Sequence, residues 1–257
     1  MKKEKYPKGV RYYDSFDNDF ESAVKAPEDF KENYLYLKKK PVFRFASFVL
    51  HNLIGPPVAF FYSRVLLRER VIGKKKLKIK GGMILYANHT EPVGDALCPH
   101  TYVFPRMAYT VVSPDNFALP GLGKIIGYLG AVPTPCDVKM ARAFSECLKT
   151  RLDCGSAVVV FPEAHVWQYY TGIRPMDKGA FVFPDKFSVP AFAVTRVYKR
   201  SRFFGFRRLI YVDGPFYADK SLSRAMSCEK LMDEVRSAML KRAAESDIEI
   251  IKYLRED

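Results

Sequence analysis

Residues 83–95 read Met83-Ile84-Leu85-Tyr86-Ala87-Asn88-His89-Thr90-Glu91-Pro92-Val93-Gly94-Asp95. The first five form an apolar run, as in a strand buried on both faces, and the rest form a polar loop bent by Pro92 and Gly94. A buried strand that runs into such a loop is typical of a layered α/β domain, in which loops at strand ends carry functional groups. The loop predicts a site built on His89 and Asp95, which lie six positions apart.

The rest of the chain alternates between strand and helix patterns. The hydrophobic periodicity predicts strands over 108–112, 131–134, 157–161, 191–197 and 209–212, and helices over 94–104, 121–129, 138–152 and 227–242. Alternation of Lys with apolar residues predicts one more strand over 76–80. Strands interleaved with helices predict an α/β fold with a mixed, mostly parallel sheet flanked by helices.

An imidazole held by a carboxylate is the arrangement needed to deprotonate a hydroxyl. Histidine titrates near neutral pH, and a carboxylate on its second nitrogen fixes the tautomer and steadies the imidazolium. His89 and Asp95 therefore predict a general base and the residue that orients it. Two simpler interpretations stay open: a His in a turn is often a surface residue, and Asp95 can be the N-cap of the helix that follows.

Two later blocks extend this pattern. The predicted strand 157–161 runs into Pro162-Glu163-Ala164-His165, and another apolar run follows at 189–194. In this order the three blocks, which lie between about residues 78 and 194, resemble the glycerolipid acyltransferase family that includes the 1-acylglycerol-3-phosphate acyltransferases.

The resemblance implies a reaction and a set of roles. A fatty acyl group would pass from an acyl thioester to a hydroxyl of a lysophospholipid, with 1-acylglycerol-3-phosphate as the expected acceptor and phosphatidic acid as the product. His89 would be the general base and Asp95 would orient it, while Glu163, Ala164 and His165 would border the acceptor. Glu163 has an equally open interpretation as a structural carboxylate in a salt bridge.

No cofactor is expected besides the co-substrate, which would be acyl-CoA or an acyl carrier protein thioester. His89, His165 and Glu163 lie on distant loops and are weak evidence for zinc, so we expect no metal. Two alternative functions remain: the same fold acting on another acceptor, and a catalytically inactive lipid-binding or scaffold protein.

Three departures from the family pattern affect the acceptor's phosphate. Five residues separate His89 from Asp95 where the family usually has four, Cys136 stands in place of an arginine, and Ala164-His165-Val166 replaces Gly-Thr-Arg. Other cations are therefore candidates to bind the phosphate through charge-assisted hydrogen bonds. Each of them can equally be an exposed surface cation without this role. These candidates are Lys139, Arg142, Arg174 and Lys178.

Charge and cysteine content narrow the class of partner. The chain has 42 Lys and Arg against 28 Asp and Glu, and the net charge of +14 predicts a polyanionic partner. No motif of a nucleic-acid-binding fold is evident, so an anionic phospholipid surface fits better, with nucleic acid as the alternative. Five cysteines without two-residue spacing favour a reducing compartment, and no signal-peptide pattern opens the chain. We therefore expect a peripheral or monotopic protein on the cytoplasmic face of the cell membrane.

Residues 45–63 are the segment best suited to a membrane surface, because they carry no formal charge when His51 is neutral. His51 and Gly55-Pro56-Pro57 in the middle disfavour a straight transmembrane helix. The pattern predicts two short helices, over 42–53 and 58–67, which are hinged at the prolines and lie in the interface, as in bacterial members of the family. The docking side chains would be Phe45, Phe48, Leu53, Phe60, Phe61 and Leu66. The alternative is packing on the protein's own core or on a partner.

The sequence thus divides into three parts. A helical arm is expected over 1–40, with a helix start at Pro27-Glu28-Asp29, although a loose tail with incidental aromatics is an open alternative. The two-helix membrane-interface segment covers 41–72. An α/β acyltransferase domain covers 73–257 and is expected to end in a C-terminal helix.

Overall fold

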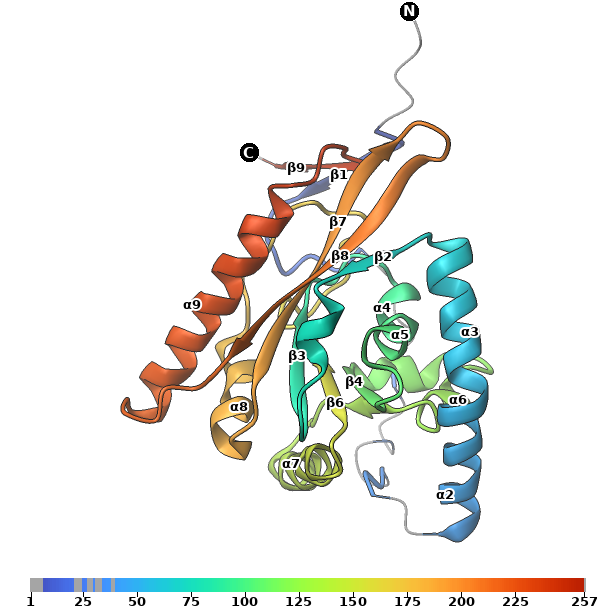
Figure 1. Cartoon of the computed structure of the whole chain (residues 1–257), viewed down its shortest axis with the longest axis vertical. Helices are drawn as coiled ribbons and strands as arrows, with labels where there is room; N and C mark the ends of the chain where they lie inside the picture. The colour runs from blue at the N-terminus through green and yellow to red at the C-terminus, as the bar shows by residue number, and fades with distance from the viewer. Residues whose placement is uncertain (1–6, 21–24, 27–29, 31–33, 38–39, 257) are drawn as a thin grey trace, which may run out of the picture.

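A computed structural model describes residues 7–20, 25–26, 30, 34–37 and 40–256 of the chain. Its centre is a seven-stranded sheet with strand order β2-β8-β7-β3-β6-β4-β5 (Figure 1). Its strands are β2 (Arg70–Ile72), β3 (Met83–Ala87), β4 (Ala108–Val112), β5 (Ala131–Pro133), β6 (Ala157–Val160), β7 (Ala191–Ser201) and β8 (Gly205–Phe216). The β7–β8 pair is antiparallel and the other pairs in this sheet are parallel. The predicted mixed, mostly parallel sheet is therefore confirmed.

Helices cover both faces of the sheet. In Figure 1, α9 lies to the left of the strands, and a long helical run containing α2 and α3 lies to the right. Besides that run, the described part of the chain contains the α-helices α4 (Gly94–Leu97), α5 (Pro99–Val103), α6 (Gly123–Ile126), α7 (Val138–Asp153), α8 (Val182–Phe187) and α9 (Arg224–Ala243). The N-cap carboxylate of α7, Asp137, accepts a hydrogen bond from the backbone N–H of Met140 at 2.7 Å, which explains why the helix begins there.

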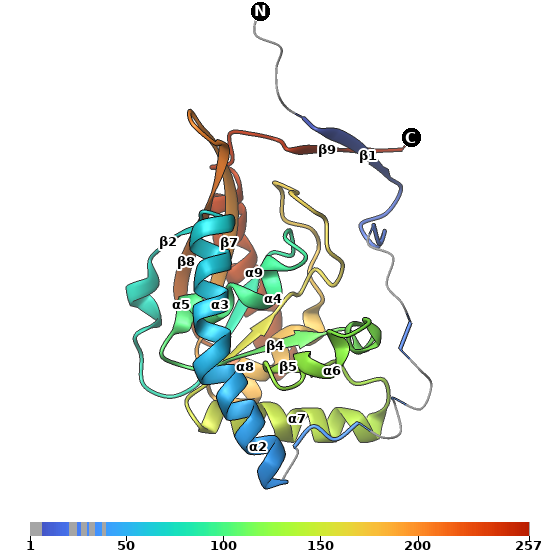
Figure 2. The same cartoon turned by 90° about the vertical axis from the view of Figure 1, so that its right-hand side faces the viewer.

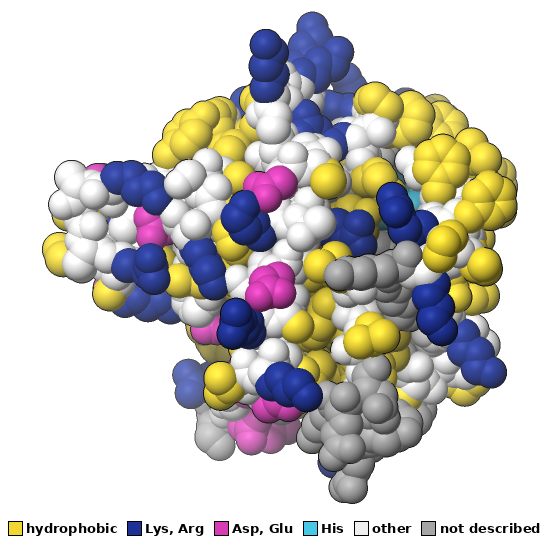
Figure 3. All heavy atoms as spheres, turned by 90° about the horizontal axis from the view of Figure 1, so that it is seen from below, with side chains coloured by type: hydrophobic (Ala, Val, Ile, Leu, Met, Phe, Trp, Pro, Cys, Tyr) yellow, Lys and Arg dark blue, Asp and Glu magenta, His cyan; other side chains and the backbone are white. Residues whose placement is uncertain are grey.

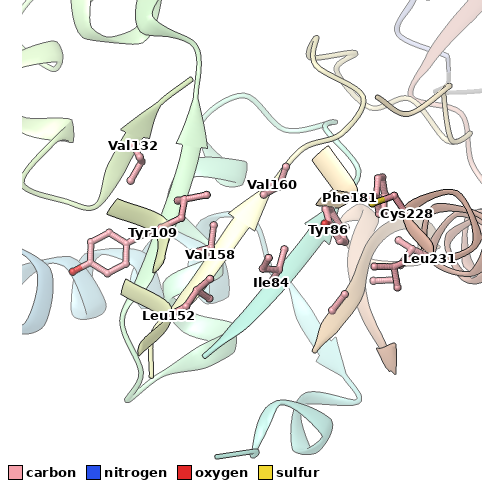
Figure 4. Close-up of a cluster of buried hydrophobic side chains, with 14 of the residues drawn as sticks. Ile84, Tyr86, Tyr109, Val132, Leu152, Val158, Val160, Phe181, Cys228 and Leu231 are labelled. Carbon is pink, nitrogen blue, oxygen red and sulfur yellow. The ribbon is translucent and has the colours of Figure 1, made fainter. Parts of the chain in front are cut away.

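Strand β3 lies at the middle of the sheet, and all five of its residues are buried. Side chains of a strand alternate between the two faces. Ile84 and Tyr86 therefore join the apolar cluster that is closed by α7 and α9 (Figure 4). Met83 and Leu85 join the cluster on the other face, together with Tyr102 of α5. This two-sided burial holds β3, and the loop that follows it, rigidly in place.

The strand predicted over 76–80 is wrong. Residues Lys74–Leu77 form a short 3₁₀ helix, preceded by Gly73 with a φ of 82°. This left-handed turn takes the chain away from the sheet edge just after the last paired residue of β2, Ile72. Residues 76–80 therefore have no neighbouring strand to pair with, although Lys and apolar residues alternate in them.

The N-terminal arm, where it is described, contains a strand instead of the predicted helix. β1 (Gly9–Tyr13) pairs in parallel with β9 (Ile251–Arg255) and forms a second, two-stranded sheet (Figure 2). Val10, Tyr12 and Tyr13 favour extended backbone, and β9 supplies the hydrogen-bonding partner. The predicted C-terminal helix is also not the end of the domain, because β9 follows α9. The expected helix start at 27–29 lies outside the described residues.

The two hinged helices predicted over 42–53 and 58–67 are in fact one continuous helical run, Pro41–Leu66. It consists of α2 (Pro41–Phe48), a π-helical turn (Val49–Ile54), α3 (Gly55–Phe61) and a second π-helical turn (Tyr62–Leu66). Prolines break a helix because they lack an N–H and crowd the preceding turn. Here the π-helical turn widens the helix just before Pro56 and Pro57, and Gly55 N–H bonds back to Leu50 O. The prolines then fall in the first turn of α3, where they are tolerated.

Half of the residues of this helical run are exposed, and few are buried. Its buried face is a narrow line of small or polar residues, namely His51, Gly55, Ala59 and Ser63. The apolar residues proposed for docking are all more than half exposed: Phe45, Phe48, Leu53, Phe60, Phe61 and Leu66. By length and composition the run could cross a membrane, which is weak evidence by itself; its most apolar window has a mean hydropathy of 1.3 and is 17% buried.

Candidate active site

The site forms where neighbouring parallel strands end. β3 pairs directly with β6, so the loop that begins at Asn88 lies beside the loop that begins at Phe161. The imidazole of His89 stacks on the Phe161 ring with a centroid distance of 4.3 Å and an angle of 22°. Sequence-distant loops are thereby brought together at the carboxyl edge of the sheet, where open α/β sheets form their sites.

His89 and Asp95 form the pair that the sequence predicts. Nδ1 of His89 lies 2.8 Å from Oδ2 of Asp95, and the side chains are 18% and 2% exposed. Nε2 makes no hydrogen bond to any residue that the structure describes. Because the carboxylate accepts a hydrogen bond from Nδ1–H, the neutral ring has its lone pair on Nε2, the nitrogen available to act as a base.

Asp95 is held by the loop that precedes it and is not the N-cap of α4, a position that Val93 occupies. Its Oδ2 accepts backbone N–H bonds from Thr90 and Glu91, both at 2.9 Å, in addition to the bond from His89. The loop therefore curls around one oxygen atom, and this curl accommodates the five residues between His89 and Asp95. The same oxygen orients the base and closes the loop.

Asn88 fixes the start of the loop. Its side-chain amide accepts a hydrogen bond from Arg196 N at 2.7 Å and donates one to Arg196 O at 3.1 Å. β3 and β7 pair in parallel up to Ala87 and Val194, so the amide continues the ladder by one more step. The position next to His89 is thus anchored to β7.

A buried charge network lies behind the pair, and its members other than Asp95 were not predicted from the sequence. The guanidinium of Arg196 forms an ion pair with Oδ1 of Asp95 and another with Glu69 at 3.0 Å. Glu69 also accepts hydrogen bonds from Ser63 Oγ at 2.8 Å and from Tyr102 OH at 3.1 Å. All five residues are buried. The network connects the buried face of the long helix to the candidate base.

The network sets the charge of Asp95. Burial raises the pKa of this carboxyl group, but the positive charge of Arg196 and the hydrogen bond from His89 outweigh it and keep the pKa below its ordinary value. Asp95 is therefore ionised at neutral pH and can stabilise a protonated His89.

Two further contacts hold the loop on the side of β7 and β8. Glu91 pairs with Arg208 at 2.7 Å, and Tyr198 OH bonds to Thr90 Oγ1 at 3.0 Å. Burial raises the pKa of Glu91, an effect that Arg208 partly offsets. These four residues are also buried, so the loop is attached to β7 and β8 through contacts shielded from solvent.

Glu163 lies close to the pair and forms a buried salt bridge. Its Oε2 contacts Nε of Arg174 at 3.1 Å and the NH2 nitrogen at 3.0 Å, with both side chains at most 1% exposed. Burial raises the pKa of Glu163, while Arg174 and then His89 lower it. The structure thus brings Glu163 to His89. Arg174, predicted as a possible phosphate ligand, is instead occupied by Glu163 and by the carbonyl oxygen of His165.

Ala164 and His165 continue the loop after Glu163. Ala164 has a φ of 63°, a left-handed conformation that glycine adopts without strain, and this accounts for the glycine that the family pattern has here. The side chain of His165 is 37% exposed, and its Nδ1 lies 3.7 Å from Asp19 of the arm. A second contact joins the arm to this loop: Nε1 of Trp167, in the loop, donates a hydrogen bond to the carbonyl oxygen of Asn18, in the arm, at 2.9 Å.

The remaining predicted cations are not brought to the pair. Lys139 and Arg142 lie in the first turns of α7, which follows β5, and β5 is the third strand from β3 in the sheet. Arg142 contacts Glu146 on its own helix at 3.4 Å. Lys178 pairs with Glu229 at 2.7 Å, although the chain just before it is close to the site, because Asp177 N bonds to Pro162 O.

No group of three or more His, Cys, Asp or Glu side chains suited to a metal ion is found among the described residues. The expectation of a metal-free reaction stays a prediction.

Comparisons with known proteins agree with this arrangement. A family model described as Acyltransferase matches residues 68–196, which include both strand-end loops and Arg196. The crystal structure of the 1-acyl-sn-glycerophosphate acyltransferase from Thermotoga maritima is similar to this chain, with a TM-score of 0.52, 16% sequence identity, and coverage of 80% of this chain and 84% of that one. At this identity the likeness shows a shared fold. No curated protein matches the sequence.

Proposed function

This chain belongs to the Acyltransferase family and is an O-acyltransferase, and we propose that it acylates a hydroxyl of a lysophospholipid with His89 as the general base. The expected acceptor is 1-acylglycerol-3-phosphate, which would give phosphatidic acid. The observation that carries the proposal is the 2.8 Å contact between His89 Nδ1 and Asp95 Oδ2, which leaves Nε2 as the basic nitrogen.

The proposed reaction is a direct transfer. His89 Nε2 takes the proton of the acceptor hydroxyl while its oxygen attacks the carbonyl carbon of the acyl thioester. The C–S bond then breaks, and the leaving thiolate takes the proton back from the imidazolium, which Asp95 stabilises in the meantime. No enzyme nucleophile and no cofactor is needed. Either acyl-CoA or an acyl carrier protein thioester can supply the acyl group in this scheme.

Contacts at the acceptor end are proposed on the loop after β6. Glu163, Ala164 and His165 would border the acceptor, and Arg174 forms a salt bridge with Glu163. Among the candidate cations, Lys178 is the best placed to meet a phosphate, because Asp177 is hydrogen-bonded to Pro162 beside the site. A phosphate would have to compete with Glu229 for this lysine.

Lysophospholipids reside in membranes, and the long helix supports a docked enzyme. We propose a peripheral or monotopic protein on the cytoplasmic face of the cell membrane, with the exposed apolar face of Pro41–Leu66 in the lipid interface. Transfer of one Phe or Leu side chain from water into the lipid stabilises the bound state by about 1.5–3 kcal/mol, so a few such side chains suffice for reversible docking.

The reaction is tested by incubating purified protein with a labelled acyl thioester and a panel of lysolipids. Wild-type protein should acylate a lysophospholipid, and His89→Ala should lower turnover by about 10²–10⁴-fold, since this is what general-base catalysis contributes. The free energy of unfolding is measured in parallel to show that the variant is folded. Equal rates for the two proteins would instead favour a lipid-binding or scaffold protein, and activity only on other hydroxyls would favour another acceptor.

Docking is tested by flotation with lipid vesicles. The double variant Phe45→Ser and Phe60→Ser should lose binding, because both side chains are more than half exposed on the helix. The matched control is Tyr217→Ser and Met226→Ser, which removes two exposed apolar side chains far from this helix. Equal loss in both double variants would contradict docking through the helix.

A further inference from the structure

A cavity of about 1110 Å³ opens at the edge of the sheet where β4 and β6 begin, opposite the edge that carries His89. Its walls come from α2, from the short helix Lys74–Leu77, from the segment between α5 and β4, and from the end of α7. The catalytic residues do not line it. Tyr102 lines it and donates a hydrogen bond to Glu69 of the buried network, but no residue with a proposed chemical role in acyl transfer lines it.

Five cations surround this cavity, and no Asp or Glu is among its described lining residues. The cations are Arg44, Lys74, Lys78, Arg106 and Arg151. Among the described residues, no ion pair involves any of them. Figure 3, the view from below, shows the same pattern: on the half that carries the α2–α3 run, Lys and Arg side chains lie beside hydrophobic ones, without visible acidic side chains.

The hydrogen bonds of these cations leave their charge uncompensated. Arg106 donates to backbone carbonyl groups, including that of Gly155 at 2.7 Å, and Lys74 Nζ donates to Thr101 O at 2.6 Å. The guanidinium of Arg151 lies 4.5 Å from the centre of the Tyr109 ring, and its buried Nε has no partner. Carbonyl groups and an aromatic ring satisfy donors and attract cations, but they carry no net negative charge.

Lys74 lies near two other positive charges, Lys78 in the cavity wall and Arg64 on the helical run. Burial lowers the pKa of this lysine, and the positive charges of Arg64 and Lys78 lower it further. An anion in the cavity would relieve this repulsion, as it would be attracted by several cations at once.

One wall of the cavity is apolar and continues into the exposed face of the helix. Phe48 lines the cavity and is 56% exposed, and Phe104 lines it on the other side and is 55% exposed. A free phosphate ion would leave these side chains in water. An amphiphile would cover them, because its negative head group would meet the cations and its hydrocarbon chain would lie against the rings.

We propose that this cavity binds one anionic phospholipid, with the phosphate among Lys74, Lys78 and Arg106 and an acyl chain along Phe48. The lipid would be a membrane component held away from His89, not the acceptor. The inference rests on the proposed membrane docking, but it does not require that the docked enzyme use any particular acceptor.

The test compares wild-type protein with a charge-reversal pair in flotation assays. Vesicles contain phosphatidylcholine alone or mixed with phosphatidylglycerol. Arg44 and Lys78 are exposed and have no ion-pair partner among the described residues, so Arg44→Glu with Lys78→Glu should fold normally. This pair should lower affinity for the anionic vesicles at least tenfold. The matched control, Lys241→Glu with Lys252→Glu, changes the net charge equally at exposed positions elsewhere and should have a much smaller effect.

Calorimetry with short-chain phosphatidylglycerol supplies the stoichiometry, and one lipid per chain is expected. If both charge-reversal pairs lower the affinity for anionic vesicles equally, the effect comes from the overall charge of the protein, and the proposal is overturned. Binding of inorganic phosphate as tight as that of the short-chain lipid would overturn a lipid ligand. His89→Ala separates the two proposals, because it should abolish acyl transfer and leave this binding unchanged.

Discussion

Arg196→Gln is the substitution that tests the buried network most directly. The side chains of Arg196, Asp95 and Glu69 are at most 4% exposed, and the guanidinium is the positive charge between the two carboxylates. Glutamine removes that charge but keeps the backbone bonds to Asn88, since these use Arg196 N and O. Removal of one partner from a buried ion pair typically costs about 3–5 kcal/mol, so the free energy of unfolding should fall by roughly that amount.

The substitution should also change the chemistry. Without Arg196, burial would dominate at Asp95, and the pKa of this carboxyl group would rise from its lowered value. A protonated Asp95 cannot stabilise the imidazolium of His89. We expect the acid limb of the pH–rate profile to move to higher pH, and turnover at neutral pH to fall by about 10–100-fold, less than the loss from His89→Ala.

Arg208→Gln is the matched control, because it unpairs a buried carboxylate of the same loop, Glu91, without touching Asp95. Both variants are followed by denaturant unfolding and by acyl transfer as a function of pH. The control should lose stability in a similar way but keep the wild-type acid limb. A folded Arg196→Gln protein with a wild-type pH profile would refute the role assigned to the network.

Three further results are expected. Ala164→Gly should raise the free energy of unfolding by up to about 1 kcal/mol in denaturant titrations, because the φ of 63° strains alanine; a loss of stability would contradict this. Burial lowers the pKa of His51 to about 3 and that of His100 to about 4. Between about pH 6.5 and 3 the unfolded chain therefore binds protons on these two histidines that the folded chain does not. Their contribution to stability should be constant above that window and fall within it as the pH drops, and His51→Leu should make the fall shallower. Incubation with a chelator should leave acyl transfer unchanged, and recovery of lost activity by added zinc would disprove metal-free catalysis.

The parts of the fold that the sequence predicts are those in which local pattern and burial coincide. The run at 83–87 is apolar on both faces because helices cover both sides of β3, so its boundaries match the prediction. His89 and Asp95 are only six positions apart, and their pairing depends on one short loop. Such short-range features require no knowledge of the rest of the chain.

The failures occur where the partner is distant or the backbone is unusual. Gly55-Pro56-Pro57 predicts a hinge, but a π-helical turn before the prolines lets the helix continue. Residues 9–13 include side chains that favour extended backbone, but they form a strand only because the C-terminal strand, about 240 positions away, lies beside them. Residues 76–80 have a strand pattern without a strand to pair with.

The network behind His89 was beyond prediction for the same reason, and it bears on how docking and catalysis are related. Arg196 is 101 positions from Asp95 and 127 from Glu69, so no spacing in the sequence connects them. Yet Glu69 accepts a hydrogen bond from Ser63. Ser63 lies on the buried side of the helix, whose other side exposes Phe60 and Phe61. Because each step of this chain of contacts is buried and charged or hydrogen-bonded, the apolar face of the helix has a set orientation relative to His89. A membrane that binds this face would therefore also set the height of the base above the lipid surface.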